Sequence, residues 1–349
     1  MGWTRRQGTS VACRGLRPGS AHWGLRTLPQ TCRDARAMNN SEGTTVVIAG
    51  ATGFIGRALV EQCIQRGLRV VAIVRDAERA RRVLGGGGGG DAIALLTWKD
   101  DLGRAVAAAD AVINLCGENV AAGRWTAKRK AILRSSRLGP TTQLVRAIAA
   151  APVAPRVLIN ASAVGYYGNR DLETLTENSS KGSGFLADLC AEWEEAAQGA
   201  EPYCRVVRLR LGVVLGAGGG MLGKLGPIVA TVGAIIPGSG RQWLSWVALT
   251  DVLRVIEWVR THGMMTGPLN VTSPEPVPMA DFMRVLAHQY RRPVWGRLPE
   301  PLLRLALGQM ATTLTDSIRA VPARLMAEGF SFDAVDLASA LRAAGVPGR

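Results

Sequence analysis

Short uncharged apolar runs alternate along this chain with longer stretches whose apolar residues recur at helical spacing. The first run, Thr45–Ala49, predicts a buried strand, a turn follows at residues 50–53, and residues 54–66 predict a helix. The same alternation of strand and helix patterns continues along the chain. It predicts an α/β fold of the Rossmann type, with a doubly wound parallel sheet covered by helices on both faces.

Strand patterns recur at 68–74, 92–97, 110–115, 156–162, 205–215 and 269–272, and helical patterns recur at 77–84, 124–150, 184–198, 279–290, 301–307 and 335–343. We expect residues 44–216 to form a nucleotide-binding domain, to whose sheet later strands could be added. We expect residues 217–345 to form a substrate cap and a small C-terminal α/β domain. Within that part, residues 225–237 predict loops and short helices. Six consecutive glycines at 85–90 predict a flexible loop.

Three glycines stand where the first predicted strand meets its helix. Glycine lets a turn approach a ligand without a Cβ, and the first N–H groups of a helix are free to bind an anion. A dinucleotide pyrophosphate is the natural anion for this geometry. An ordinary strand-to-helix turn is the alternative, but the surrounding alternation favours a cofactor. The expected cofactor contacts here are Gly50, Thr52, Gly53, Phe54, Ile55 and Gly56.

Arg75 ends the second predicted strand, about twenty residues past the glycines, where such folds read the adenosine ribose. An acid at this place binds the 2′-hydroxyl of NAD, whereas a guanidinium suits a 2′-phosphate. NADP is therefore the expected cofactor and NAD is less favoured, although the adjacent Asp76 could also reach the ribose. The segment after the fourth strand should complete the cofactor site with Leu115, Cys116, Gly117 and Glu118.

The composition is that of a globular α/β protein. The chain has 349 residues, 47% of them apolar and 20% charged, enough for one large domain and a smaller appendage. The longest uncharged run, 225–240, is broken by glycine and proline, so we expect no membrane span. Six cysteines without paired spacing indicate free thiols in a reducing compartment. The three histidines lie far apart, so no metal site is predicted.

The formal charge of +15 is partly concentrated at the amino terminus. Residues 1–33 contain arginines but no Asp, Glu or Lys, which is typical of an organelle transit peptide. A disordered tail is the alternative for residues 1–40. The arginine content and modest serine content favour the mitochondrial matrix over the chloroplast stroma. The basic cluster within residues 124–137 lacks an aromatic stacking platform, so we expect a solvated helix face and no nucleic-acid partner.

The glycine triplet, Ser162 and the strand–helix alternation together resemble the extended short-chain dehydrogenase/reductases. More narrowly, the runs DAVINLCGE at 110–118, SAVGYYG at 162–168 and GSGRQ at 238–242 resemble the atypical "epimerase family". The run RLMAEGFSF, ending at Phe332, is similar to the small C-terminal domain of that family. The resemblance covers residues 44 to about 344. Members carry labels such as NAD(P)-dependent epimerase, oxidoreductase or cell-division inhibitor.

In that superfamily a tyrosine and a lysine four residues later move the proton, while a serine holds the substrate oxygen. No tyrosine of this chain has a lysine four residues on, and Leu186 and Cys190 stand at the expected positions. The resemblance therefore implies Ser162 as the orienting group, with Tyr166 or Tyr167 as the proton donor, or both tyrosines packed beside the nicotinamide. A tyrosine without a nearby cation, with a pKa of about 10, can donate in a carbonyl reduction but is a poor base. Epimerisation needs proton transfer in both directions, from the tyrosine and to it, and is therefore disfavoured.

The predicted cap contains Arg241, Gln242 and Trp243, which we expect to approach an anionic or polar substrate. Related enzymes place a histidine nearby, where this chain has Ala248, and Asp251 is either a helix cap or a functional acid. Two functions remain open. One is an NADPH-dependent reductase of a small carbonyl compound. The other is a catalytically silent nucleotide-binding regulator with a protein partner in an organelle, linked to organelle division.

Overall fold

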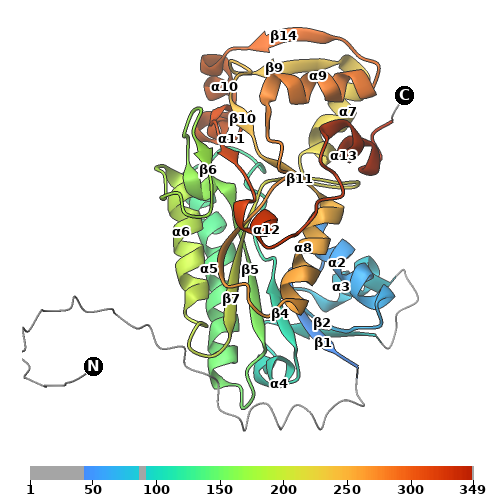
Figure 1. Cartoon of the computed structure of the whole chain (residues 1–349), viewed down its shortest axis with the longest axis vertical. Coiled ribbons are helices and arrows are strands. Elements are labelled where there is room, and N and C mark those ends of the chain that lie inside the picture. Colours follow the sequence, from blue (N-terminus) through green and yellow to red (C-terminus); the bar gives the residue numbers. More distant parts are fainter. Residues whose placement is uncertain (1–42, 86–91, 348–349) are drawn as a thin grey trace, which may run out of the picture. The chain divides into compact units, whose positions relative to one another are not determined.

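A seven-stranded parallel sheet forms the centre of the fold (Figure 1). The computed structural model describes residues 43–85 and 92–347, all within one unit, Gly43–Arg349. The predicted targeting segment at residues 1–40 lies outside the described residues, as do residues 86–90 of the predicted glycine loop. The strands follow the order β3 (Ile93–Thr97), β2 (Arg69–Val74), β1 (Thr45–Ala49), β4 (Ala111–Asn114), β5 (Val157–Ala163), β7 (Arg205–Leu211) and β12 (Gly267–Val271).

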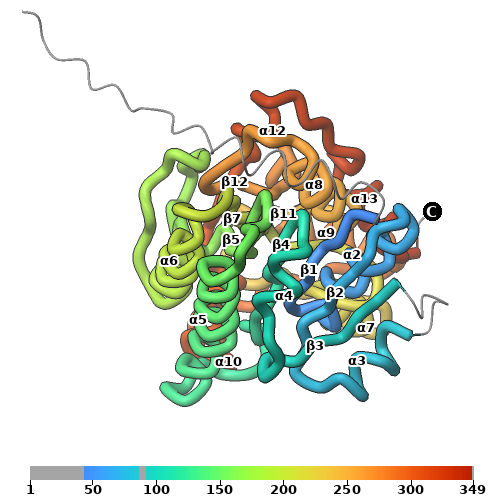
Figure 2. The backbone as a smooth tube through the Cα atoms, turned by 90° about the horizontal axis from the view of Figure 1, so that it is seen from below, coloured from blue at the N-terminus to red at the C-terminus, as the bar shows by residue number. Residues whose placement is uncertain are grey.

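Helices cover both faces of this sheet, because alternate strand residues point to opposite sides. In β1, Val46 and Ile48 pack against one helix layer, while Val47 and Ala49 pack against the other. The first layer holds α2 (Phe54–Gln65), α3 (Ala77–Leu84), α8 (Leu249–Thr261) and α12 (Ala323–Ala327), and the second holds α4 (Leu102–Ala107), α5 (Ala127–Ala150) and α6 (Phe185–Gln198). Figure 2 shows the two layers on either side of the strands. The prediction of a doubly wound Rossmann fold is confirmed.

The expected long strand over residues 205–215 is wrong, because the chain leaves the sheet at Gly212. β7 ends at Leu211, and β8 (Val213–Leu215) pairs with β11 (Trp246–Ala248) instead. The Gly212 amide donates to the carbonyl of Val271, and a Cβ on Gly212 would lie 2.8 Å from the carbonyl oxygen of Ser245. The backbone of Ser245 and the methyl group of Thr272 approach this point too closely for a side chain, and only glycine fits where the chain leaves the sheet.

A smaller lobe follows, with its own apolar core. It contains α7 (Leu222–Val232), β9 (Ala234–Pro237), β10 (Trp243–Leu244), β13 (Val277–Pro278), α9 (Met279–Gln289), β14 (Val294–Leu298) and α13 (Leu337–Ala343). The elements α10 (Glu300–Leu307), η3 (Gly308–Ala311) and α11 (Thr312–Thr315) follow β14, and Leu307 and Met310 pack in a separate cluster with Leu133 of α5 and Leu189 of α6. Residues 225–237, predicted as loops and short helices, form the end of the 11-residue helix α7 and the strand β9. The helix α8 was not predicted. Along the chain, α8 and β12 come after β10 and before β13 of the lobe, and β12 is the last strand of the central sheet.

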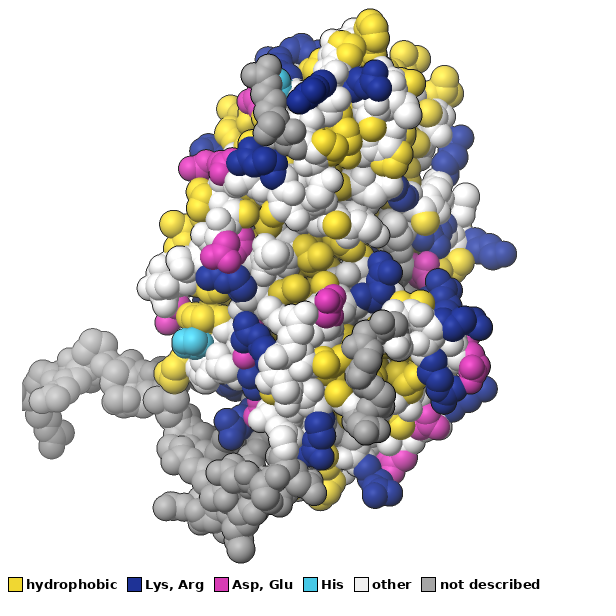
Figure 3. Space-filling view, turned by 90° about the vertical axis from the view of Figure 1, so that its right-hand side faces the viewer, with side chains coloured by type: hydrophobic (Ala, Val, Ile, Leu, Met, Phe, Trp, Pro, Cys, Tyr) yellow, Lys and Arg dark blue, Asp and Glu magenta, His cyan; other side chains and the backbone are white. Residues whose placement is uncertain are grey.

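Two surface properties complete the description of the fold. Among the described residues, no helix combines the length and the apolar character needed to cross a membrane. On the face shown in Figure 3, Lys and Arg side chains lie interspersed with Asp and Glu. The four described cysteines are free thiols, and two of them, Cys63 and Cys190, are buried.

Candidate functional site

The glycine corner joins β1 to α2 by close backbone contacts. Gly50 has φ +83°, and a Cβ there would lie 2.8 Å from the backbone of Leu115. A Cβ on Gly56 would lie 2.2 Å from the carbonyl oxygen of Gly50, so the helix can pack on the turn only with glycine. Gly53 caps α2 with no side-chain hydrogen bond. The first amides of α2 therefore remain available to an anion.

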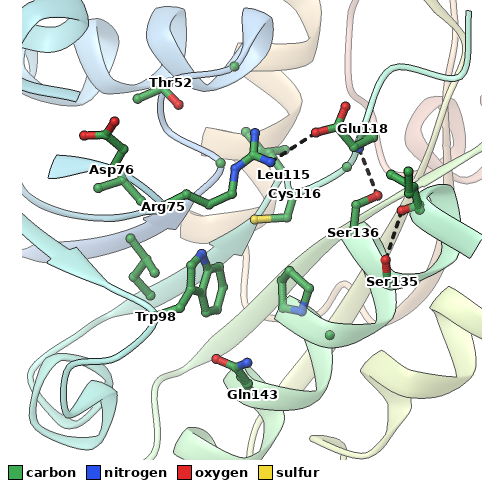
Figure 4. A pocket seen from close by; sticks show the side chains of 18 of the residues that line it. Thr52, Arg75, Asp76, Trp98, Leu115, Cys116, Glu118, Ser135, Ser136 and Gln143 are labelled. Carbon is green, nitrogen blue, oxygen red and sulfur yellow. Dashed lines mark hydrogen bonds and ion pairs between the residues drawn. The ribbon is translucent and has the colours of Figure 1, made fainter. Parts of the chain in front are cut away.

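A groove of about 760 Å³ opens at this corner, along the carboxyl ends of the strands (Figure 4). It lies where the strand order reverses, between β2 and β4 on either side of β1, which is the ligand crevice of such sheets. Its lining includes Trp98 after β3 and the α5 residues Ser135, Ser136 and Gln143. No local sequence pattern indicates these four residues, because they come from elements that meet only in the folded chain.

Most of the predicted cofactor residues do line this groove, namely Gly50, Thr52, Gly53, Arg75, Leu115, Cys116, Gly117 and Glu118. The side chains of Phe54 and Ile55 do not. The Phe54 ring lies against the glycines after β8, such as Gly219, and Ile55 packs on the core. Gly56 is buried beneath the turn. These three positions can meet a ligand only through the backbone at the start of α2.

Two charged residues follow β2 at the groove wall. Arg75 is exposed, and its Nη1 lies 3.1 Å from Glu118 Oε1. Asp76 begins α3 as its N-cap, because its Oδ1 accepts from the Arg79 amide at 3.0 Å. The carboxylate of Asp76 is thus already engaged in capping. The guanidinium of Arg75 is the group of the two that can turn toward a phosphate.

The residues expected to move a proton lie in a different environment, a buried network between β5, α6 and β7. Ser162 is 2% exposed, and its Oγ donates to Glu194 Oε1 at 2.6 Å. Arg210 makes a bidentate pair with the same carboxylate, at 2.9 Å for each bond. Burial lowers the pKa of Arg210, but the hydrogen bonds and charge of Glu194 outweigh this and raise it above its usual value. Ser162 thus serves an ion pair in this structure.

The two candidate tyrosines differ in access. Tyr167 is fully buried, and its hydroxyl lies 2.7 Å from Asn270 Oδ1 and 3.0 Å from Arg210 Nη1. Burial raises its pKa, opposed by the charge of Arg210. Tyr166 is half-buried, and its ring lies under the Arg210 guanidinium, 3.6 Å from ring centroid to Cζ. Of the two hydroxyls, that of Tyr167 is enclosed by structural partners.

Leu186 and Cys190 occupy the helix positions that face the end of β5. A Cβ on Gly165 would lie 3.4 Å from Leu186 Cβ and 3.8 Å from the Cys190 sulfur. Burial raises the pKa of the Cys190 thiol to about 12, and the charge of Glu194 adds to the shift. Neither side chain can exchange a proton with a substrate at neutral pH. The network of Glu194 and Arg210 was missed from the sequence, although Arg210 within the apolar run of β7 signals a buried cation that needs a partner.

The predicted substrate residues have separate environments. Arg241 is exposed, whereas Gln242 is buried and its Nε2 donates to the carbonyls of Pro237 and Leu314. Trp243 is half-buried with Arg319 above its ring, at 4.4 Å.

Asp251 is neither an N-cap nor an exposed acid. It is fully buried in the first turn of α8, and its carboxylate accepts from the amides of Asp333 and Ala334. It fastens the C-terminal segment to α8. Within the part of the chain that the structure describes, no group of three or more His, Cys, Asp or Glu side chains is arranged to hold a metal ion.

A glycine corner without side chains, at the point where the strand order of a parallel sheet reverses, defines a Rossmann-type dinucleotide-binding protein. Residues 46–271 match the model of the NAD dependent epimerase/dehydratase family, and residues 298–344 match a domain of unknown function, DUF1731. The chain belongs to the NAD dependent epimerase/dehydratase family.

Three relatives illustrate this membership. An epimerase family protein of Mycobacterium bovis is 40% identical, over 82% of this chain and 93% of its own. An Arabidopsis thaliana relative, named epimerase family protein SDR39U1 homolog, chloroplastic, is 34% identical over 86% of each chain. The crystal structure of human epimerase family protein SDR39U1 (isoform 2) with NADPH has a TM-score of 0.77 and 28% identity, covering 86% of this chain and 99% of the human one. The family resemblance drawn from the sequence is confirmed.

Proposed function

We propose that this protein binds NADPH and uses it to reduce a small carbonyl compound. The observation that carries the cofactor assignment is the exposed guanidinium of Arg75 beside a groove with a bare glycine corner. A guanidinium matches a 2′-phosphate in charge and geometry. The human SDR39U1 structure, which contains NADPH, supports the same choice.

The residues of the groove fit the parts of this cofactor. The turn at residues 50–53 and the first amides of α2 would hold the pyrophosphate, because neither carries an obstructing Cβ or a capping side chain. Arg75 would bind the 2′-phosphate. The segment Leu115–Glu118 would form the edge on the other side of the crevice. When bound, NADPH supplies a hydride to an electrophilic carbon.

Tyr166 is our choice of proton donor. In the reaction, the carbonyl carbon gains the hydride, the carbonyl oxygen takes the proton of the Tyr166 hydroxyl, and water returns a proton to the tyrosinate. The Arg210 guanidinium lies over the Tyr166 ring, 3.6 Å from its centroid, and this contact holds the ring in place. Neither tyrosine has the lysine four residues on that makes the superfamily tyrosine a base, which supports reduction and disfavours epimerisation.

A single-turnover experiment tests the reductase. NADPH bound to the wild-type chain should lose its fluorescence when a carbonyl library contains a substrate. Tyr166→Phe should slow that loss by about 100-fold without changing the NADPH dissociation constant. Tyr203→Phe, which alters an exposed tyrosine, is the matched control. If no compound of the library causes a loss of NADPH fluorescence, or if the rate of loss is the same in Tyr166→Phe as in the wild type, the result counts against this mechanism.

Cofactor choice has its own test. Arg75→Ala should raise the ratio of the NADPH dissociation constant to the NADH dissociation constant about tenfold, because a charge-assisted bidentate pair to the 2′-phosphate is lost only for NADPH. Isothermal titration of both nucleotides measures this. Equal weakening of the two would reject the role of Arg75.

A second function is favoured by the environment of α6. Leu186 and Cys190 leave the usual proton-transfer positions apolar, and Ser162 is held by Glu194. These features would suit a silent protein whose bound nucleotide regulates a partner in an organelle. A partner captured with NADPH present and released without it would favour this function, together with an absence of turnover.

The arginine-rich residues 1–40 support delivery to an organelle matrix, with the mitochondrion favoured over the chloroplast. The chloroplastic name of the Arabidopsis relative keeps the second destination in view. Fusing residues 1–40 to a fluorescent protein tests the proposal. Diffuse fluorescence outside both organelles would reject it.

A further inference from the structure

An ion pair crosses the groove at the glycine corner. Arg75 Nη1 lies 3.1 Å from Glu118 Oε1, and the pair joins the end of β2 to the segment after β4. These two strands flank β1, so the pair spans the crevice. Figure 4 shows the Arg75 side chain extended across the groove toward Glu118. The guanidinium therefore occupies space that a dinucleotide along the strand ends needs.

Opening this pair requires only side-chain rotation. The Arg75 side chain is 81% exposed, so it can turn freely, while that of Glu118 is 31% exposed. The backbone of Glu118 is fixed to α5, because its amide donates to Ser136 Oγ and its carbonyl accepts from Arg137 Nη2, both at 3.1 Å. The edge of the groove stays in place when the side chains separate.

A second cation lies on the other side of the Glu118 carboxylate. Arg129 Nη2 is 3.9 Å from Glu118 Oε2, and the Arg129 side chain is 17% exposed. Its Nη2 donates to the carbonyl of Asn119, whereas its buried Nε has no hydrogen-bond partner among the described residues. Arg129 can therefore take the carboxylate that Arg75 releases.

We propose that Glu118 sets the affinity of the groove by holding Arg75 until a nucleotide displaces it, and that Arg129 then receives the carboxylate. The inference rests on the proposed binding of NADPH. An exposed ion pair is weak enough to open on binding. The 2′-phosphate of NADPH gives Arg75 a new and stronger partner, whereas NADH opens the same pair and offers none.

Removing the carboxylate should therefore strengthen binding. Glu118→Gln should lower the dissociation constants of NADPH and NADH by about three- to fivefold each, the range expected from one exposed ion pair. High salt should reduce this gain, because exposed charges are screened. In an Arg75→Ala background, Glu118→Gln should have no effect, because the pair is already absent.

Two further variants separate the ion pair from a general charge effect. Glu78→Gln breaks the exposed Glu78–Arg81 pair on α3, outside the groove lining, and should leave both constants within twofold of the wild type. Glu118→Asp keeps the charge but shortens the side chain by one methylene, so it should release Arg75 and strengthen binding as Glu118→Gln does. This variant also serves if the first one misfolds.

The experiment is titration of each purified chain with NADPH and NADH, read by nucleotide fluorescence and by calorimetry. Stronger binding in both Glu118 variants, lost in the Arg75→Ala background, is the expected result. Unchanged or weaker binding in Glu118→Gln, with wild-type binding intact, would overturn the inference alone. So would an equal gain in Glu78→Gln or in the Arg75→Ala background. Failure of the wild-type chain to bind NADPH would overturn the proposed function and the inference together.

Discussion

The glycine corner is built from backbone atoms, whereas the network around Arg210 is built from side chains. The corner is formed by backbone atoms of residues 50–56, and it leaves an open groove. The network is formed by side chains of Ser162, Glu194 and Arg210, all nearly inaccessible to solvent. Both lie at the carboxyl ends of strands of one sheet, the corner after β1 and the network at β5 and β7, with β4 between β1 and β5. The two regions thus lie at the same edge of the sheet, but the corner leaves space for a ligand and the network consists of buried side chains that contact one another.

This difference separates a region that is open to a ligand from one occupied by its own side chains. The corner can accept a nucleotide because no side chain occupies the approach to α2. In the network, the carboxylate of Glu194 already receives three hydrogen bonds, one from Ser162 and two from Arg210. A substrate would have to compete with a buried ion pair for these groups. The comparison predicts that variants in the network change stability and variants in the corner change binding.

The largest expected effect comes from Glu194→Gln. It removes the charge that compensates a buried guanidinium, so the free energy of unfolding should fall by about 3 kcal/mol. Urea unfolding followed by circular dichroism measures this. The dissociation constant of NADPH should stay within twofold of the wild type, because Glu194 does not line the groove.

Glu192→Gln is the matched control on the same helix. Glu192 also pairs with an arginine, Arg134 at 2.9 Å, but the two side chains are 38% and 41% exposed. Its loss should therefore cost less than about 1 kcal/mol. Equal effects of the two substitutions, or a large loss of NADPH affinity in Glu194→Gln, would remove the distinction between the regions.

The sequence predicted the corner well because glycine is required there by local backbone geometry. The spacing of Gly50, Gly53 and Gly56 needs no knowledge of distant residues. The sheet was predictable for the same reason, since apolar runs and helical spacing are local signals. The break at Gly212 had a local signal too, because a glycine inside a strand pattern often marks close approach of another backbone.

The network could not be predicted in the same way. Ser162, Glu194 and Arg210 lie on three elements, and their contacts exist only after β5, α6 and β7 assemble. Serine and tyrosine are residue types that suit catalysis. Only the fold reveals that the Ser162 hydroxyl binds Glu194 and the Tyr167 hydroxyl binds Asn270. The pairing of Arg75 with Glu118 is likewise invisible along the chain, 43 positions apart.

An intermediate effect is expected for Gly56→Ala, which tests the corner directly. The new Cβ would stand 2.2 Å from the Gly50 carbonyl oxygen, which is backbone and cannot rotate away. Separation of α2 from β1 should cost about 1–3 kcal/mol of stability. Calorimetry should show NADPH affinity reduced more than tenfold, because the amides of α2 are displaced.

Gly223→Ala in α7 is the control, since the nearest atom to the added Cβ, the backbone carbon of Gly218, lies 4.0 Å away. There the added methyl should leave NADPH binding unchanged and raise stability by up to about 1 kcal/mol through helix propensity. Wild-type NADPH affinity in Gly56→Ala would show that the corner is not the binding site.

The smallest expected effect is that of Asp316, which lies outside both regions. Its contribution to the pH dependence of stability can therefore be measured without changing either region. Burial, together with the charge of Glu300, raises the pKa of Asp316 from 3.8 to about 6. The folded protein therefore gains stability from the protonated acid below about pH 4, and loses it as the pH rises to about 6. Asp316→Asn should be stabilising by about 1 kcal/mol at pH 7, after allowance for solvent screening, and neutral at pH 4. Urea unfolding at both pH values measures this, and equal stabilisation at pH 4 and pH 7 would contradict the raised pKa of Asp316.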